Sequence, residues 1–197
     1  LGAVVVDSFD VADLTELRRG ASGCRTFRYD VGRYLAGLGD SAPIKDVNEV
    51  LETGQYSEYV KERLERYGEA RADGPPETWD PPCPDYAEHA GRQAYKDAVV
   101  AAMDEARVEA IVYPTWTNPP ATLDKASEEY RGDNSQIVAP ATGLPAATVP
   151  MGYTRDVLPA GLQILARPFE EGVIFRLAYA FEQGTQHRRP PAGFGAR

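Results

Sequence analysis

The alternation of apolar and polar residues along the chain predicts both strands and helices. Short runs rich in Val, Ile and Ala, bounded by Gly, Pro or Asp, predict buried strands at residues 2–7, 108–113, 146–150 and 160–165. Apolar residues spaced three or four apart predict helices at residues 27–38, 47–53, 59–67, 86–107 and 170–187. Because helices and strands are interleaved, the pattern predicts an α/β fold.

The two longest predicted helices each carry an apolar stripe that we expect to face a sheet. In the helix at 86–107 the expected inner residues are Ala90, Ala94, Val99 and Met103. In the helix at 170–187 they are Val173, Leu177, Ala178 and Phe181.

A proline-rich segment, ADGPPETWDPPCPD at residues 72–85, separates two regions of the chain. Proline removes backbone donors and fixes φ, so this segment is predicted to be a loop, and its Trp79 is interpreted as a wall of a pocket. The region before it, 1–71, is predicted to hold one strand and several helices. The region after it, 86–191, is predicted to hold the core of the sheet and the terminal helix.

Charge and cysteine content narrow the range of partners. The formal net charge of -9 argues against binding to nucleic acid or to an anionic membrane surface. Cys24 and Cys83 lack a CxxC partner, and we interpret them as two structural thiols, with a single disulfide as the alternative. Acidity and sparse cysteine together predict a cytoplasmic location.

No catalytic group is evident within the chain. Ser22 lies between glycines but lacks the GxSxG pattern, and no lysine follows a serine by three residues. His89 and His187 belong to no HExxH motif or His/Cys cluster, and no triad pattern includes them. No GxGxxG or GxxxxGK[ST] occurs, so we predict no metal, no cofactor and no catalytic residue here.

Several blocks in the last ninety residues form an ordered set. They are the strand ending Val112-Tyr113-Pro114-Thr115, the segment 134–150 around Gly143-Leu144-Pro145-Ala146, the run Leu158 to Gln163, the run Arg167 to Glu171, and the residues 177–183 and 187–191. In order and spacing they resemble the carboxyl-terminal region of the amidase signature family.

This resemblance implies the fold, the chemistry and the extent of the chain. Enzymes of this family have a mixed twisted sheet with helices on both faces, and they hydrolyse or transfer the acyl group of a carboxamide. They use a serine nucleophile, a second serine held by a cis peptide bond, and a proton-shuttling lysine. No such signature is present, so the chain resembles the C-terminal portion of a single amidase domain, with the N-terminal catalytic half missing.

The resemblance also implies which residues approach a substrate. Gly143 and Pro145 are expected to fix a turn that presents the preceding segment to a cleft. The residues predicted to bind substrate are Thr115, Trp116, Asn134, Ile137 and Val138. The structural alternatives are that Ile137 and Val138 belong to the core and that Asn134 caps a helix beginning at Ser135. Ser135 and Thr142 are interpreted as turn and helix-end residues.

Three functions remain open. The first is an amidase acting on a small-molecule carboxamide, with this fragment inactive alone. The second is a subunit similar to the glutamine-dependent amidotransferases that act on charged tRNA. The third is a non-catalytic interaction module. Since half of the domain is expected to be missing, exposed sheet edges predict self-association, so the expected partner is either a homo-oligomer or the N-terminal half.

Overall fold

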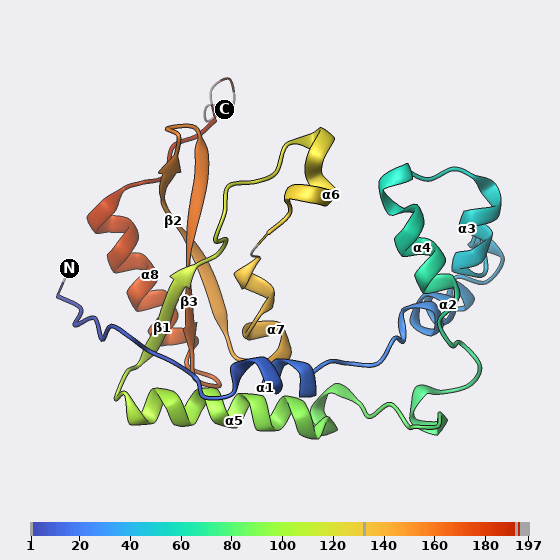
Figure 1. The fold of residues 1–197 in the computed structure, drawn as a ribbon, viewed down its shortest axis with the longest axis horizontal. Coiled ribbons are helices and arrows are strands. Elements are labelled where there is room, and N and C mark those ends of the chain that lie inside the picture. The colour runs from blue at the N-terminus through green and yellow to red at the C-terminus, as the bar shows by residue number, and fades with distance from the viewer. Residues whose placement is uncertain (1, 132, 192, 194–197) are drawn as a thin grey trace. The chain divides into compact units, whose positions relative to one another are not determined.

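The computed structural model describes residues 2–131, 133–191 and 193, and these fold into two compact units (Figure 1). The sheet unit comprises Leu1–Ser22 and Ala90–Arg197, and the helical unit comprises Gly23–His89. Leu1 and Gly132 lie outside the described residues. Within the described part of the chain, no helix is long and apolar enough to cross a membrane.

Three strands build the sheet. They are β1 (Ala110–Pro114), β2 (Ala146–Thr154) and β3 (Leu158–Ala166), in the order β1-β3-β2. β2 and β3 form a hairpin, while β1 pairs with the other edge of β3, and both pairings are antiparallel. The three strands predicted at 108–113, 146–150 and 160–165 are therefore confirmed, although β2 and β3 extend further than the apolar runs. No parallel pair occurs among these described strands.

Helices cover both faces of the sheet (Figure 1). Helix α8 (Glu171–Thr185) packs Ile174 against Ile164 and Ala166 of β3. Leu165, whose side chain points to the opposite face, packs against α5 (Ala90–Glu105). This second core is completed by α1 (Leu14–Gly20) and by the short α7 (Ala139–Thr142). The α/β class with helices on both faces of a sheet is thus confirmed.

The buried face of α5 differs from the predicted one. Val99 and Met103 are fully buried as expected, but Ala90 and Ala94 are exposed. Tyr95 replaces them, because residues 95, 99 and 103 are spaced by four and share one face of the helix. The Tyr95 hydroxyl donates to the carbonyl oxygen of Ile137 at 3.2 Å, which allows this polar group to be buried.

The helical unit contains three of the predicted helices. They are α2 (Phe27–Gly37), α3 (Val47–Thr53) and α4 (Lys61–Gly68). Asp46 caps α3 by accepting a hydrogen bond from Asn48 N, and Gly54 ends the helix with a left-handed φ of 65°. Arg28 of α2 ties the unit together, since it pairs with Asp46 at 3.0 Å and donates to the Gly68 carbonyl oxygen at 2.8 Å.

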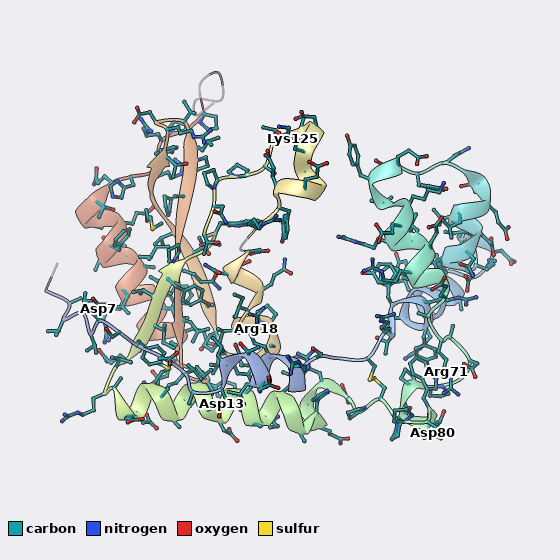
Figure 2. The ribbon with its side chains drawn as sticks, viewed as in Figure 1. Asp7, Asp13, Arg18, Arg71, Asp80 and Lys125 are labelled. Carbon is teal, nitrogen blue, oxygen red and sulfur yellow. A yellow bond between two sulfur atoms is a disulfide. The ribbon has the colours of Figure 1, made fainter. Side chains whose placement is uncertain are left out.

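A disulfide joins Cys24 to Cys83 across this unit, so the interpretation of two free thiols is wrong (Figure 2). The two residues lie 59 positions apart, and sequence spacing alone did not show that the helices between them bring the sulfurs together. Trp79 is buried rather than lining a pocket, because its Nε1 donates to the carbonyl oxygens of Asp73 and Gly74. The proline-rich loop therefore contributes two buried side chains, Trp79 and Cys83, to this unit, while most of its other residues are exposed.

The N-terminal run is not a strand in this structure, contrary to prediction. Residues 2–7 are without regular secondary structure, and Val4 and Val5 are 91% and 80% exposed. A run of β-branched residues forms a strand only where a neighbouring strand accepts its hydrogen bonds, and none of the described strands pairs with it.

Candidate substrate-binding site

The candidate site begins where β1 ends. Thr115 N donates to the Gly161 carbonyl oxygen at 2.8 Å, which extends the pairing with β3 one residue beyond Pro114. Asn134 then holds this strand end twice: its backbone N donates to Thr115 O, and its side-chain Nδ2 donates to Pro114 O, both at 2.9 Å. These two bonds, called the Asn134 clamp below, hold the segment around residue 134 against the end of β1.

Asp133 fixes the start of the docked segment. Its carboxylate accepts hydrogen bonds from Ser135 N at 3.1 Å and from Gln136 Nε2 at 2.6 Å, and its backbone forms an antiparallel bridge with Trp116. Asp133 therefore caps the 3₁₀ turn Asn134–Gln136, and the alternative that Asn134 is the cap is wrong. The amide of Asn134 instead donates to the Pro114 carbonyl oxygen at the end of β1.

Trp116 lies beside this clamp with part of its indole in solvent. It is 42% exposed, and its ring meets that of Tyr130 edge to face, with centroids 5.4 Å apart and planes at 90°. Tyr130 follows the short helix α6 (Ala126–Glu129) and is 53% exposed. In Figure 2 the side chain of Lys125 marks the start of α6.

Two threonines meet over a glycine next to the strand end. Thr115 Oγ1 and Thr148 Oγ1 are 3.4 Å apart, above Gly161 of β3. A Cβ at Gly161 would lie 2.6 Å from Thr148 Cγ2 and 2.8 Å from Thr115 Oγ1, so only glycine fits there without displacing a neighbour. This places two hydroxyl groups on the face of the sheet that also carries Tyr113.

Beneath the threonines lie two buried polar groups. Tyr113 and Gln163 are cross-strand neighbours, and within the described residues neither Tyr113 Oη nor Gln163 Oε1 has a hydrogen-bond partner. Burial, with a smaller contribution from Tyr95, raises the pKa of the Tyr113 hydroxyl to about 12.

Ile137 and Val138 continue the docked segment toward the core. The Ile137 carbonyl oxygen accepts from Tyr95, and the half-buried Val138 side chain packs against the core around Tyr95 and Leu144. The hydroxyl groups of Ser135 and Thr142 bond locally, to Asp133 and to the Val138 carbonyl oxygen. Their predicted roles as turn and helix-end residues are confirmed.

The structure brings three of the five predicted residues into direct neighbourhood: Thr115, Trp116 and Asn134. Ile137 and Val138 lie further along the same segment, and contact of all five with a substrate stays a prediction. Tyr130 was missed, because no periodic pattern links it to Trp116. Tyr113 could have been predicted, since residues 111, 113 and 115 share one face of β1 and its extension.

The described residues contain no group of three or more His, Cys, Asp or Glu side chains placed to hold a metal ion. An open hollow of about 380 Å³ lies elsewhere, at the ends of β2 and α8. It is lined by Gly152, Tyr153, Asp156, Gln186, His187 and Arg189, and includes none of the predicted substrate-binding residues.

Known proteins that resemble this chain in sequence and in fold are amidotransferase subunits and amidases. The chain shares 37% identity over 91 residues with a glutamyl-tRNA(Gln) amidotransferase subunit of Methanosarcina barkeri, covering 43% of this chain and 19% of that protein. For the same subunit of Pseudomonas entomophila the identity is 38% over 108 residues, covering 52% and 22%. The crystal structure of peptide amidase from Stenotrophomonas maltophilia matches 94% of this chain and 36% of its own, with a TM-score of 0.60 and 23% identity, and so shares the fold.

The family model described as Amidase matches residues 26–175. The chain therefore belongs to the amidase family, as the ordered blocks in its last ninety residues predicted. It spans about one fifth of the length of the curated relatives it matches.

Proposed function

We propose that this chain is the C-terminal portion of an amidase that hydrolyses carboxamide C–N bonds to a carboxylate and ammonia or an amine. In this proposal the chain supplies scaffold and one wall of the substrate pocket, while the catalytic serines and lysine come from residues outside it. The observation that carries the proposal is the clamp of Asn134 on Pro114 and Thr115 in a member of the amidase family.

The chemistry explains why this chain needs a complement. In the mechanism implied by the family, a serine oxygen attacks the amide carbon, the C–N bond breaks, and the departing nitrogen takes a proton from a lysine-linked relay. Water then releases the carboxylate from the acylated serine. Thr142 does not fit the part of the nucleophile, because its hydroxyl donates to the Val138 carbonyl oxygen, which cannot act as a base. The Asp133 carboxylate to which Ser135 donates also accepts from Ser135 N and Gln136 Nε2, so it acts as the cap of a turn.

Extending the reading frame upstream of Leu1 tests the proposal. We expect a Gly/Ser-rich block with two serines, preceded by a lysine, and an extended protein that releases ammonia from carboxamides. A complete upstream reading frame without these residues would contradict the proposal, and so would an extended protein that folds but releases no ammonia.

A second candidate is a subunit that releases ammonia from glutamine for transfer to charged tRNA. The observation that favours it is the 37% identity with a protein named as a subunit of glutamyl-tRNA(Gln) amidotransferase. The same extended protein separates the two candidates. Preference for glutamine over simple carboxamides supports the amidotransferase, and the reverse preference supports the amidase.

A third candidate is a non-catalytic interaction module that retains only the C-terminal scaffold. Its support is the engagement of the site's hydroxyls in local hydrogen bonds. An upstream frame that lacks the serines and the lysine would favour this candidate over both enzymes.

A further inference from the structure

Trp116 and Tyr130 form an exposed aromatic corner at the candidate site. They come from different segments, at the end of β1 and after α6, and meet edge to face at 5.4 Å. Large aromatic side chains that remain 42% and 53% exposed contribute little to a core. Such rings offer apolar area in a fixed orientation, which suits recognition of another apolar group.

Backbone hydrogen bonds hold the segment that carries Trp116. The backbone of Trp116 bridges to Asp133, and Asn134 bonds to the two residues that precede Trp116. These bonds fix the backbone that carries the indole, and the ring contact with Tyr130 orients the indole itself. A preorganised contact loses less conformational entropy on binding than a mobile one.

The charges around the corner disfavour an anionic ligand. Among residues 124–133 the acidic side chains are those of Asp124, Glu128, Glu129 and Asp133, and the basic ones are those of Lys125 and Arg131. Four negative and two positive charges give a net charge of -2. Lys125 pairs with Glu129 at 3.9 Å, and Arg131 donates to the Tyr130 carbonyl oxygen at 2.8 Å. A carboxylate on the ligand would meet an acidic surrounding here.

We propose that the Trp116–Tyr130 corner determines substrate specificity by accepting an aryl or branched apolar acyl group of the carboxamide. This inference rests on the proposed amidase function and names its substrate class. Glutamine, which carries a charged amino acid head group and no apolar body, fits this corner poorly.

Indole NMR signals of the chain test the inference directly. The chain contains two tryptophans, Trp116 at the corner and Trp79 in the helical unit, where its Nε1–H donates to Asp73 O. Titration with phenylacetamide should move the Trp116 indole signal saturably and leave that of Trp79 in place. Acetamide and glutamine at the same concentrations should move neither signal.

Substitutions at Tyr130 separate recognition from structure. Tyr130→Phe keeps the ring and should bind phenylacetamide like the unchanged chain, whereas Tyr130→Ala should weaken binding at least tenfold. Tyr59→Ala removes a tyrosine that is 75% exposed in the helical unit and serves as the matched control. A Trp116 signal that does not move, or moves equally with acetamide, or binding that Tyr130→Ala leaves unchanged, overturns the inference.

Failure of the inference is distinguishable from failure of the proposed function. If Trp116 binds phenylacetamide but the extended protein releases no ammonia, the proposed function fails and the recognition of apolar carboxamides stands. If the extended protein hydrolyses acetamide and phenylacetamide equally well while the Trp116 signal stays in place, the amidase stands and the specificity role of the corner fails.

Discussion

Glycine at position 161 is required by the side chains that meet above it. Alanine there would bring a methyl group within 2.6 Å of Thr148 Cγ2 and 2.8 Å of Thr115 Oγ1. We predict that Gly161→Ala lowers the free energy of unfolding by about 1–3 kcal/mol, a typical cost of overpacking. Denaturant unfolding of the sheet unit, followed through the Trp116 signal, measures the change.

Two further variants make this prediction specific. Adding Thr148→Ser to Gly161→Ala removes the nearer clashing carbon and should restore part of the lost stability. Gly172→Ala, in α8 with no atom within 4 Å of the added carbon, should leave stability unchanged or slightly raised. Equal destabilisation by Gly161→Ala and Gly172→Ala would contradict the account of the site's geometry.

Tyr113 gives the chain a defined response to alkaline pH. Its pKa is raised to about 12 in the folded state, while an unfolded tyrosine titrates near pH 10. Between these values the folded state holds the proton that the unfolded state has lost, so the free energy of unfolding falls as pH rises through this window.

The matching substitution is Tyr113→Phe, and the measurement is chemical unfolding from pH 7 to 12. At pH 7 the variant should be as stable as the unchanged chain or more stable, because Tyr113 Oη has no hydrogen-bond partner among the described residues. Above pH 10 the free energy of unfolding of the unchanged chain should fall by up to about 1.4 kcal/mol per pH unit because of Tyr113, and this fall should be absent in the variant. Parallel pH curves for the two proteins would refute this role of Tyr113.

At the scale of elements, the disulfide stabilises the helical unit. Cys24 and Cys83 close a loop of 59 residues, and the entropy removed from the unfolded chain corresponds to about 4 kcal/mol. Reduction should therefore lower the midpoint of unfolding reported by Trp79, which lies in this unit, more than that reported by Trp116. A Cys24→Ser, Cys83→Ser double variant should show the lowered midpoint without reductant and no further response to it. Equal midpoints before and after reduction would show that the bond adds no stability.

Elements with their own strong pattern could be predicted from the sequence, and those that depend on partners could not. The helix at 47–53 and the stripe of α8 are local properties: α3 has the predicted bounds, and Val173, Leu177 and Ala178 pack as predicted, although the buried Ile174 was left out of the stripe. The rotation of α5 toward Tyr95 depends on a hydrogen bond to Ile137, which lies 42 residues away. The disulfide likewise depends on the path of the chain between two distant cysteines, and its presence removes one of the two supports for a cytoplasmic location.

The candidate site follows the same division. Thr115, Trp116 and Asn134 were selected through the family's ordered blocks, and the structure places them together at the end of β1. Tyr130 reaches Trp116 only through tertiary folding, so no local signal identified it. The oxygens of Tyr113 and Gln163 lack a hydrogen-bond partner among the described residues because of tertiary burial, so the sequence could not show this either.

At the scale of the whole molecule, exposed apolar segments predict self-association. Val4 and Val5 are 91% and 80% exposed in a run without regular secondary structure, and exposed β-branched segments that pair with none of the described strands tend to pair with other chains. We expect sedimentation to show concentration-dependent oligomers, and Val5→Lys to shift them toward monomer. Leu123→Lys, at a residue 90% exposed in the 3₁₀ turn Leu123–Lys125, is the control and should change the distribution less. A monomer that melts in one sharp, concentration-independent transition would contradict this expectation.

The central claim is that this amidase-family chain frames a substrate site whose catalytic groups lie elsewhere. Ammonia release from phenylacetamide and acetamide by the purified chain tests it most directly, with Ser135→Ala as the matched variant. The account predicts rates equal to the uncatalysed reaction for both proteins, since the proposed serines and lysine lie outside this chain and Asp133, the partner of Ser135, serves as a turn cap. Turnover by the unchanged chain that disappears in Ser135→Ala would place the catalytic centre within these residues and overturn the claim.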